Sequence, residues 1–449
     1  MNIRQVIITA WLCLTALFAG AQQKPNIILI LTDDMGSADV GCYGGKVVPT
    51  PYLDKMAAEG IRFTQYYSAS PICSPSRAGI LTGSHPAKWN LTSYLQTRKG
   101  NAACEQADFL RAQAPSVARL LKGAGYRTGH FGKWHMGGGR DVDNAPSIRE
   151  YGFDEYSSTW ESPDPDPVLT SGNWIWSKTD SIRRWDRTGY FVDRTLAFLA
   201  ANKGAPCFVN LWPDDVHTPW VPDEAAMNMA PKGAESQRQF EAVLANYDRQ
   251  IGRLLEGLKK LGLDQNTLIV FTSDNGALPT FGFRSGPFRG TKLSLYEGGI
   301  RMPLIVRFPG KIKAGEVDSI SVLSATDLLP TFCRMAGIAG KALPAMDGIN
   351  RAGVLLGKRS AQRRTLFWEY GRNQTSFHYP RGRDRSPSLA VRDGKWKLLV
   401  NADGSAAELY DLENDPSEQS NIAAQYESIS TQLKEKLLAW YRSLPTLKK

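Results

Sequence analysis

The chain has 449 residues, enough for two domains or for one large domain with a smaller appendage. Its composition, 42% hydrophobic and 22% charged, is typical of globular proteins and excludes a disordered or fibrous chain. The net charge of +10 favours an anionic partner such as nucleic acid, anionic lipid or acidic polysaccharide, although a merely basic surface gives the same charge.

The first 21 residues have the pattern of a secretory signal peptide. Arg4 precedes an apolar run from Val6 to Phe18, and the small residues Ala19, Gly20 and Ala21 follow as a cleavage site. A transmembrane helix needs about 20 consecutive apolar residues, and this run is shorter. We therefore expect an exported protein without a stable membrane anchor, periplasmic or secreted if its source is bacterial. Export also argues against nucleic acid as the anionic partner.

Four short apolar runs predict buried strands, because they are continuous, rich in β-branched residues and bounded by turn residues. These runs span residues 26–31, 126–129, 207–212 and 267–271. Helical patterns lie between and around them, at residues 52–59, 115–124, 191–202 and 235–261. Strands that alternate with helices predict an α/β fold with a large, mostly parallel sheet covered by helices on both faces.

Oxygen-bearing side chains follow two of these strands directly. Asp33 and Asp34 come after the first strand, and Asp274 and Asn275 come after the last. Ligands of open α/β sheets bind beyond the carboxyl ends of the strands, and hard oxygen donors suit Ca²⁺ or Mg²⁺. Either pair alone is also a common turn or helix cap. Two such pairs at matching strand ends predict a metal site.

Histidines follow the other two strands. The second strand leads to Lys133 and His135, and the third leads to His217. The chain contains only five histidines, so two at this edge of the sheet favour a catalytic site there.

Cysteine usage singles out Cys73. Cys13 leaves with the signal peptide, and the five cysteines that remain are too widely spaced for a disulfide scaffold. Cys73 stands where a loop enters a helix, and the helix N-terminus together with Arg77 favours an anion or a charged nucleophile. A buried structural cysteine is the simpler alternative. A thiol phosphatase is disfavoured, because its usual arginine position is occupied by Gly79.

The segment from Cys73 to Gly83, CSPSRAGILTG, resembles the signature of the type I, formylglycine-dependent sulfatases of the alkaline phosphatase-like superfamily. The resemblance runs from about residue 25 to the C-terminus. Further similar stretches lie at residues 33–36, 41–44, 50–54, 132–135, 217–219, 273–276, 289–292, 297–299, 409–412 and 415–416.

This resemblance implies an exported, exo-acting hydrolase of sulfate esters on a sulfated poly- or oligosaccharide. A dedicated maturase would oxidise Cys73 to formylglycine. One hydroxyl of the hydrate would attack sulfur, and the second would expel sulfate. The implied metal is Ca²⁺, favoured over Mg²⁺. Its ligands would be Asp33, Asp34, Asp274, Asn275 and the modified Cys73.

The resemblance also assigns roles to the cations and histidines, in a reaction that depends on charge stabilisation and positioning. Arg77 and Lys133 would neutralise the charge of the sulfate. His135 would assist deprotonation of the second hydroxyl, and His217 and Lys292 would lie at the leaving oxygen, with either as general acid.

After about Leu343 the pattern changes. Strand-like runs at residues 365–368 and 396–400, followed by Leu433, Leu437 and Leu438 at helical spacing, predict a small α+β subdomain with a terminal helix. The expected division is a signal peptide at 1–21, a catalytic domain at 22–344 and a C-terminal subdomain at 345–449.

A basic loop in this subdomain is a candidate for substrate binding. Arginine matches carboxylate and sulfate groups with two hydrogen bonds, so His378, Arg381 and Arg383 are assigned to an anionic sugar, although a solvated loop is the alternative. Trp368 and Tyr370 are expected either to stack on sugar rings or to pack in the core.

Two other functions stay open. The same scaffold would serve a phosphomonoester or phosphonate hydrolase. If Cys73 is not modified, the chain would be a non-catalytic protein that binds sulfated glycans.

Overall fold

The computed structural model describes residues 24–172, 175–229, 233–282, 284–359, 363–372 and 380–446. Within these ranges nine strands form one mixed sheet, in the order β4-β3-β5-β1-β6-β7-β2-β8 with β9 beside β2. Its strands are β1 (Asn26–Thr32), β2 (Ile61–Tyr67), β3 (Arg127–Gly132), β4 (Glu155–Ser158), β5 (Cys207–Trp212), β6 (Thr267–Ser273), β7 (Arg301–Arg307), β8 (Glu316–Asp318) and β9 (Leu323–Ser324).

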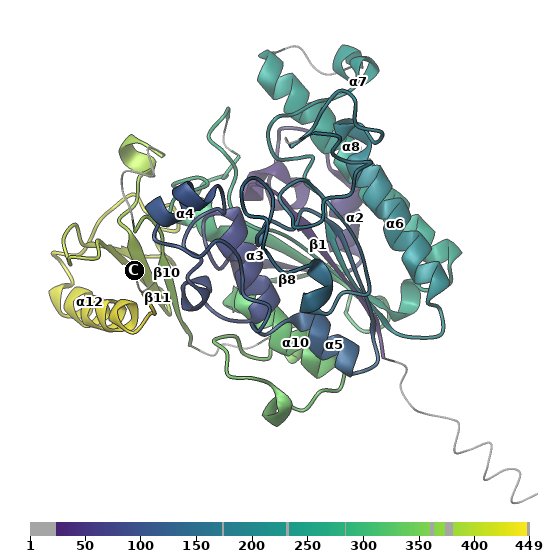
Figure 1. Cartoon of the computed structure of the whole chain (residues 1–449). Helices are drawn as coiled ribbons and strands as arrows, with labels where there is room; N and C mark the ends of the chain where they lie inside the picture. Colours follow the sequence, from purple (N-terminus) through teal and green to yellow (C-terminus); the bar gives the residue numbers. More distant parts are fainter. Residues whose placement is uncertain are drawn as a thin grey trace, which may run out of the picture.

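Helices cover both faces of this main sheet (Figure 1). The longest is α8, which packs against α2 and α6 on one face, whereas α3, α5 and α10 pack together on the other. The helices are α2 (Pro51–Ala58), α3 (Cys73–Thr82), α4 (Arg98–Ala103), α5 (Val117–Gly123), α6 (Arg187–Ala201), α7 (Glu224–Met229), α8 (Glu235–Lys260), α9 (Glu297–Ile300), α10 (Leu328–Met335), α11 (Ala352–Leu355) and α12 (Glu427–Arg442).

The central strand β1 explains why both faces need helices. Its side chains alternate: Ile27, Leu29 and Leu31 belong to one buried cluster, and Ile28 and Ile30 belong to another. A strand buried on both sides reads as a continuous apolar run, which is why the sequence reveals it. The predicted α/β fold with a mostly parallel sheet is confirmed.

The four strands predicted from the sequence are neighbours in the sheet. Strands β3, β5, β1 and β6 lie side by side and run parallel, so their carboxyl ends meet at one edge. The strands that were not predicted include β7, which lies between β6 and β2 and runs antiparallel to both.

A second, antiparallel sheet lies in the C-terminal part, in the order β10-β11-β12-β13. Its strands are β10 (Thr365–Glu369), β11 (Leu389–Asp393), β12 (Trp396–Val400) and β13 (Glu408–Asp411). Helix α12 packs on this sheet, because Leu433 and Leu437 share a buried cluster with Val391 and Leu398. The predicted small sheet and terminal helix are therefore confirmed.

Buried ion pairs join the two sheets. Lys397 of β12 donates to Glu297 at 2.8 Å and pairs with Glu418 at 2.9 Å. Tyr67 of β2 donates to Glu297 at 2.6 Å, and Arg301 of β7 lies 3.3 Å from the same carboxylate. Buried charges are tolerated when they are paired in this way. We call Tyr67, Glu297, Arg301, Arg392, Lys397 and Glu418 the bridging network.

The expected signal peptide lies outside the described residues. In the part of the chain that is described, the cysteines at 42, 73, 104, 207 and 333 are free thiols. No helix there has the length and apolar character needed to cross a bilayer.

Candidate active site

Cys73 opens helix α3 and is buried, with 2% of its surface exposed. Its Sγ lies 4.0 Å from Asp34 Oδ1. Burial raises the pKa of the thiol well above its ordinary value, although Lys133 and Lys292 favour the thiolate. Because the thiolate is the nucleophilic form, an unmodified Cys73 is a poor nucleophile here.

The carboxyl ends of β1 and β6 bring the predicted oxygen ligands together. Thr32 pairs with Ser273 in the sheet, so the residues that follow these strands become neighbours. The Asp34 amide donates to Asp274 Oδ1 at 3.2 Å, and the Asn275 side chain donates to Asp34 Oδ1 at 2.7 Å.

Local backbone geometry supports this arrangement. Asp34 has a left-handed φ of 59°, a conformation that costs energy for a residue other than glycine and is concentrated at functional sites. A Cβ on Gly276 would lie 2.1 Å from the Gly298 carbonyl oxygen, so only glycine fits after Asn275.

Three cations compensate these carboxylates. Lys133 Nζ lies 2.9 Å from Asp33, and Lys292 Nζ lies 2.8 Å from Asp34. The Arg77 guanidinium donates two hydrogen bonds to Asp274, at 3.0 and 2.8 Å, and lies 3.4 Å from Asp33. All six side chains are buried, so each charge acts in a medium of low dielectric constant.

The carboxyl groups respond to these surroundings in opposite directions. Burial opposes ionisation of Asp33, but Lys133, His217 and Arg77 hold its pKa well below the ordinary value. Burial and the charge of Asp33 raise the pKa of Asp274 to about 7, against the effect of Arg77. The site thus contains a cluster of carboxylates with cations around it.

The two candidate general acids lie together. Lys292 Nζ is 3.4 Å from His217 Nε2, which in turn is 3.5 Å from Asp34 Oδ2. Burial lowers the pKa of His217. Burial alone would lower that of Lys292 as well, but Asp34 raises it above its ordinary value. Lys292 is therefore the cation of the pair.

A buried arginine that the sequence analysis did not single out fixes the His217 loop. Arg184 donates to the His217 carbonyl oxygen at 2.7 Å and to the Asp214 carboxylate at 2.9 Å. Arg187 shares the same carboxylate at 3.0 Å. No motif marks these residues, because their partners are distant in sequence.

The donor set fits a hard divalent cation. Ligand atoms of Asp33, Asp34, Cys73 and His217 all lie within 4.8 Å of one another. Asp33 Oδ1 and Asn275 Oδ1 are buried and accept no hydrogen bond from the described residues. Buried oxygens without hydrogen-bond partners are costly, and a cation coordinated by oxygen would satisfy them.

His135 joins the cluster through a residue that the sequence analysis missed. Glu161 Oε2 lies 3.2 Å from His135 Nδ1 and 3.4 Å from Lys133 Nζ, and Arg140 binds the other oxygen at 3.1 Å. Burial opposes ionisation of Glu161, yet His135, Lys133 and Arg140 lower its pKa to about 2. Burial lowers the pKa of His135 to about 3.

Glu161 follows β4, the outermost of the parallel strands, so it reaches the same carboxyl edge as the predicted residues. Its position after a short polar strand gave no sequence signal. His135 has a φ of 52° and its Nε2 lies 3.1 Å from the Leu95 carbonyl oxygen. Glu161 and this carbonyl together fix the ring.

We expect Glu161→Gln to lower kcat by about ten- to a hundred-fold, the usual effect of losing a carboxylate that orients functional side chains. The amide keeps the shape but loses the charge that holds Lys133 and His135, so KM should change less than kcat. Steady-state kinetics with an aryl sulfate would measure both. Glu155→Gln, in which β4 loses the carboxylate paired with Arg194 at 2.6 Å, is the control; equal effects of the two changes would contradict a positioning role.

The structure bears differently on each of the residues predicted to bind substrate. His378 lies outside the described residues. Arg381 and Arg383 are exposed, and their assignment to substrate stays a prediction. Trp368 and Tyr370 are 2% and 6% exposed and pack in one buried cluster with Cys73. Sugar stacking by these two rings is thereby excluded in favour of core packing.

The site combines an acidic centre, surrounding cations and a buried cysteine at the head of a helix, an arrangement suited to a hydrolytic enzyme. The family model described as "Sulfatase" matches residues 25–338, and the model described as "N-sulphoglucosamine sulphohydrolase, C-terminal" matches residues 290–443. The chain belongs to the sulfatase family and is a sulfuric ester hydrolase, as its sequence motifs indicated.

Named relatives agree with this assignment. N-acetylgalactosamine-6-O-sulfatase of Bacteroides thetaiotaomicron is 29% identical, covering 92% of this chain and 93% of the relative. Human N-acetylgalactosamine-6-sulfatase is 32% identical over 78% of this chain and 69% of its own length. The crystal structure of Ps i-CgsB in complex with k-i-k-neocarrahexaose superposes with a TM-score of 0.77, at 28% identity and 93% coverage of both chains.

Proposed function

We propose that this protein hydrolyses sulfate esters of a sulfated carbohydrate, with Cys73 acting after its oxidation to formylglycine. The observation that carries the proposal is the position of Cys73, at the head of α3 and beside Asp34, within a ring of lysine and arginine side chains. These three cations face three carboxylates, so a divalent cation held by the carboxylates would give the site the net positive charge that favours a strong anion as substrate.

The chemistry follows from the hydrate of the aldehyde. One hydroxyl oxygen loses its proton and attacks sulfur, while the bond between sulfur and the sugar oxygen breaks and that oxygen takes a proton from Lys292 or His217. The second hydroxyl then loses its proton, assisted by His135, and the C=O bond reforms as sulfate leaves. Addition of water to the aldehyde restores the hydrate.

The side chains of the site would act by holding charge rather than by bonding to sulfur. Arg77 and Lys133 would offset the negative charge of the sulfate group, as preorganised cations do in related transfers. Asp33, Asp34, Asp274 and Asn275 would hold Ca²⁺, which would polarise a sulfate oxygen. Glu161 would keep Lys133 and His135 in place.

For the sugar, we propose the 6-O-sulfate of N-acetylgalactosamine, at the end of a glycan chain, as the first substrate to test. Support comes from two relatives named for that activity, one bacterial and one human. The relative bound to a carrageenan oligosaccharide supports a galactan sulfate as the second substrate. We also propose export, on the pattern of residues 1–21.

The direct test compares 4-nitrophenyl sulfate, 4-nitrophenyl phosphate and N-acetylgalactosamine 6-sulfate as substrates of the protein made in its native host. Release of sulfate from the sugar, with the phosphate ester much slower, is the expected result. Faster phosphate release would favour the phosphomonoester hydrolase, and binding of the sugar without turnover would favour a glycan-binding protein.

Removal of the metal provides a second prediction. Treatment with a calcium chelator should abolish turnover, and added Ca²⁺ should restore it, because the site would lose the charge that polarises the sulfate group. The unfolding free energy should fall by about 2.7 kcal/mol relative to protein at a hundred-fold excess of Ca²⁺ over its Kd. Calorimetry would measure this change, and an unchanged midpoint with full activity would exclude a resident cation.

A further inference from the structure

A cavity of about 720 Å³ lies between the edge of the main sheet and the C-terminal sheet. Strands β2 and β7, the segment after β8 and the turn between β11 and β12 form its walls. None of its lining residues belongs to the catalytic cluster. The volume falls within the range of sites that hold small ligands.

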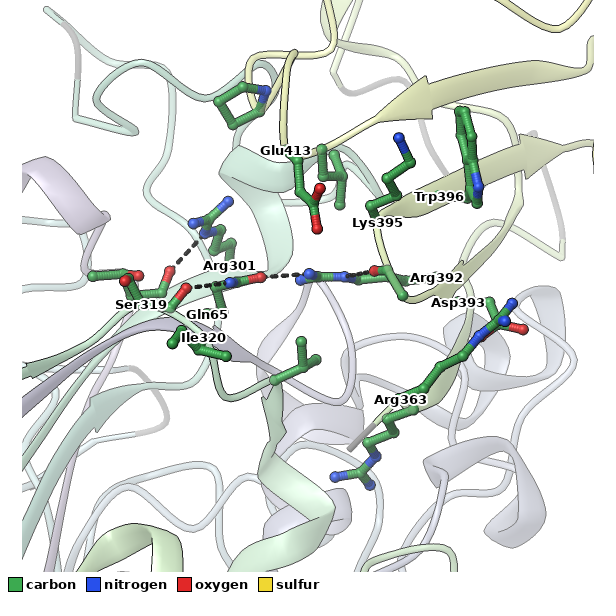
Figure 2. Close-up of a pocket in the computed structure, with 16 residues that line it drawn as sticks. Gln65, Arg301, Ser319, Ile320, Arg363, Arg392, Asp393, Lys395, Trp396 and Glu413 are labelled. Carbon is green, nitrogen blue, oxygen red and sulfur yellow. Dashed lines mark hydrogen bonds and ion pairs between the residues drawn. The ribbon is translucent and has the colours of Figure 1, made fainter. Parts of the chain in front are cut away.

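Arg392 is the central side chain of this cavity. Figure 2 shows it joined to Gln65 across the middle, with Lys395 and Trp396 on one side and Arg363 on the other. Arg392 is only 4% exposed. Its Nε donates to the Gly394 carbonyl oxygen at 3.0 Å, and its other two nitrogens donate to Tyr67 and Gln65.

All three of these acceptors are uncharged. Among the described residues, no carboxylate lies within ion-pair distance of the Arg392 guanidinium, whereas Arg301 pairs with one carboxylate and Lys397 with two. The charge of Arg392 acts on Glu297 only from beyond ion-pair distance, and a buried charge without a direct counter-ion is costly. The cavity beside Arg392 is therefore the place where an anion would be stabilised.

The charge count of the bridging network points the same way. Its three cations, Arg301, Arg392 and Lys397, face two carboxylates, Glu297 and Glu418. Burial raises the pKa of Glu418, against the effect of Lys397. The network beside the cavity thus has an excess of positive charge, and two of its cations, Arg301 and Arg392, line the cavity.

The rim adds groups suited to a sugar. Arg363 is 72% exposed and binds Asp393 through its Nε at 2.6 Å. Lys395 lies 4.6 Å from the ring centroid of Trp396, which is half-buried and leaves part of its surface at the cavity. Glu413 is the remaining carboxylate of the rim besides Asp393. Arginine donors beside an indole ring bind sulfate and the apolar face of a sugar ring.

We propose that this cavity is a second, non-catalytic site that binds a sulfated oligosaccharide, with its sulfate group at Arg392 and a sugar ring against Trp396. The proposal rests on the proposed function only for the choice of glycan. A polymer bound here would keep its ends at high local concentration near the active site. The second site would therefore lower KM for long substrates and not for small ones.

The test uses the Cys73→Ala protein, which cannot turn substrate over, and a chondroitin 6-sulfate hexasaccharide as the probe. Isothermal titration is expected to give two sites per chain. Changing Trp396→Ala and Arg363→Ser together should remove one of them, or weaken it at least tenfold. The control Arg253→Ser removes an exposed arginine with one carboxylate partner at 2.6 Å and should leave both sites.

In the otherwise unaltered enzyme, the same double change should leave kcat/KM for 4-nitrophenyl sulfate unchanged and raise KM for the polymer. A single site in the Cys73→Ala protein, or identical isotherms with and without the double change, would overturn the proposal. The titration needs no turnover. Absence of sulfate release by the parent enzyme would therefore refute the proposed function, and the binding isotherms would still test the second site. Thermal unfolding of both variants verifies that they are folded.

Discussion

Cys73→Ala is expected to reduce sulfate-ester hydrolysis by about 10⁴-fold or more, the scale on which enzymes lose activity when the nucleophile is removed. Alanine keeps the helix start and removes only the reacting group, so the cations and carboxylates around it remain. Assays with 4-nitrophenyl sulfate on protein from the native host would measure the loss. The midpoint of thermal unfolding should change little, because one buried sulfur atom is removed from a helix that stays packed.

Peptide mass spectrometry of the unaltered protein completes this test. The tryptic peptide that contains residue 73 should carry the aldehyde or its hydrate in the active fraction. Full activity in protein with an intact thiol would contradict the mechanism, and so would activity in the alanine variant.

Arg77→Ala is expected to destabilise the protein by about 3–5 kcal/mol, the cost of leaving buried carboxylates without their partner. Arg77 is fully buried. Its guanidinium holds Asp274 with two hydrogen bonds, donates to the Lys133 carbonyl oxygen at 2.8 Å and lies 5.3 Å from the ring centroid of Trp212. Urea denaturation would measure the loss of stability.

Arg77→Lys separates stability from catalysis. Lysine keeps the charge but cannot reproduce the planar pair of donors, so kcat/KM should fall by about a hundred-fold, as when a preorganised donor to the reacting group is lost. Arg307 is the matched control, since it is 2% exposed and also joins two carboxylates, Glu59 at 2.7 Å and Asp264 at 2.9 Å. Arg307→Lys should lower stability without lowering kcat/KM; a similar kinetic loss in both would assign the effect of Arg77 to folding alone.

Sequence reasoning succeeded where local pattern and sheet geometry agree. Strands β1, β5 and β6 are buried on both faces and therefore appear as apolar runs, and β3 lies beside β5 although it contains the buried polar residues Thr128 and His130. Because they are parallel neighbours, the polar residues that follow them had to converge. This is why Asp33, Lys133, His217 and Asp274 could be assigned to one site before any contact was known.

The same reasoning failed where a role depends on partners distant in the chain. Glu161 and Arg184 lie in segments without periodicity, and only the fold brings them against His135 and His217. The segment 289–299 divides in an unexpected way: Lys292 enters the site, whereas Arg289 donates to Tyr410 of the C-terminal sheet and Glu297 joins the bridging network. A motif therefore does not reveal which of its residues are structural.

If Cys73 is oxidised as proposed, the burial of α3 bears on when that oxidation takes place. Each of the ten residues from Cys73 to Thr82 is buried, and the helix packs against α5 and α10. An enzyme that modifies Cys73 would have to reach this segment, and none of its ten residues is accessible once the chain has folded. Oxidation of Cys73 would therefore have to come before folding, while the segment is still extended. A chain that folds before this oxidation would be stable but inactive, because Cys73 could no longer be reached and oxidised.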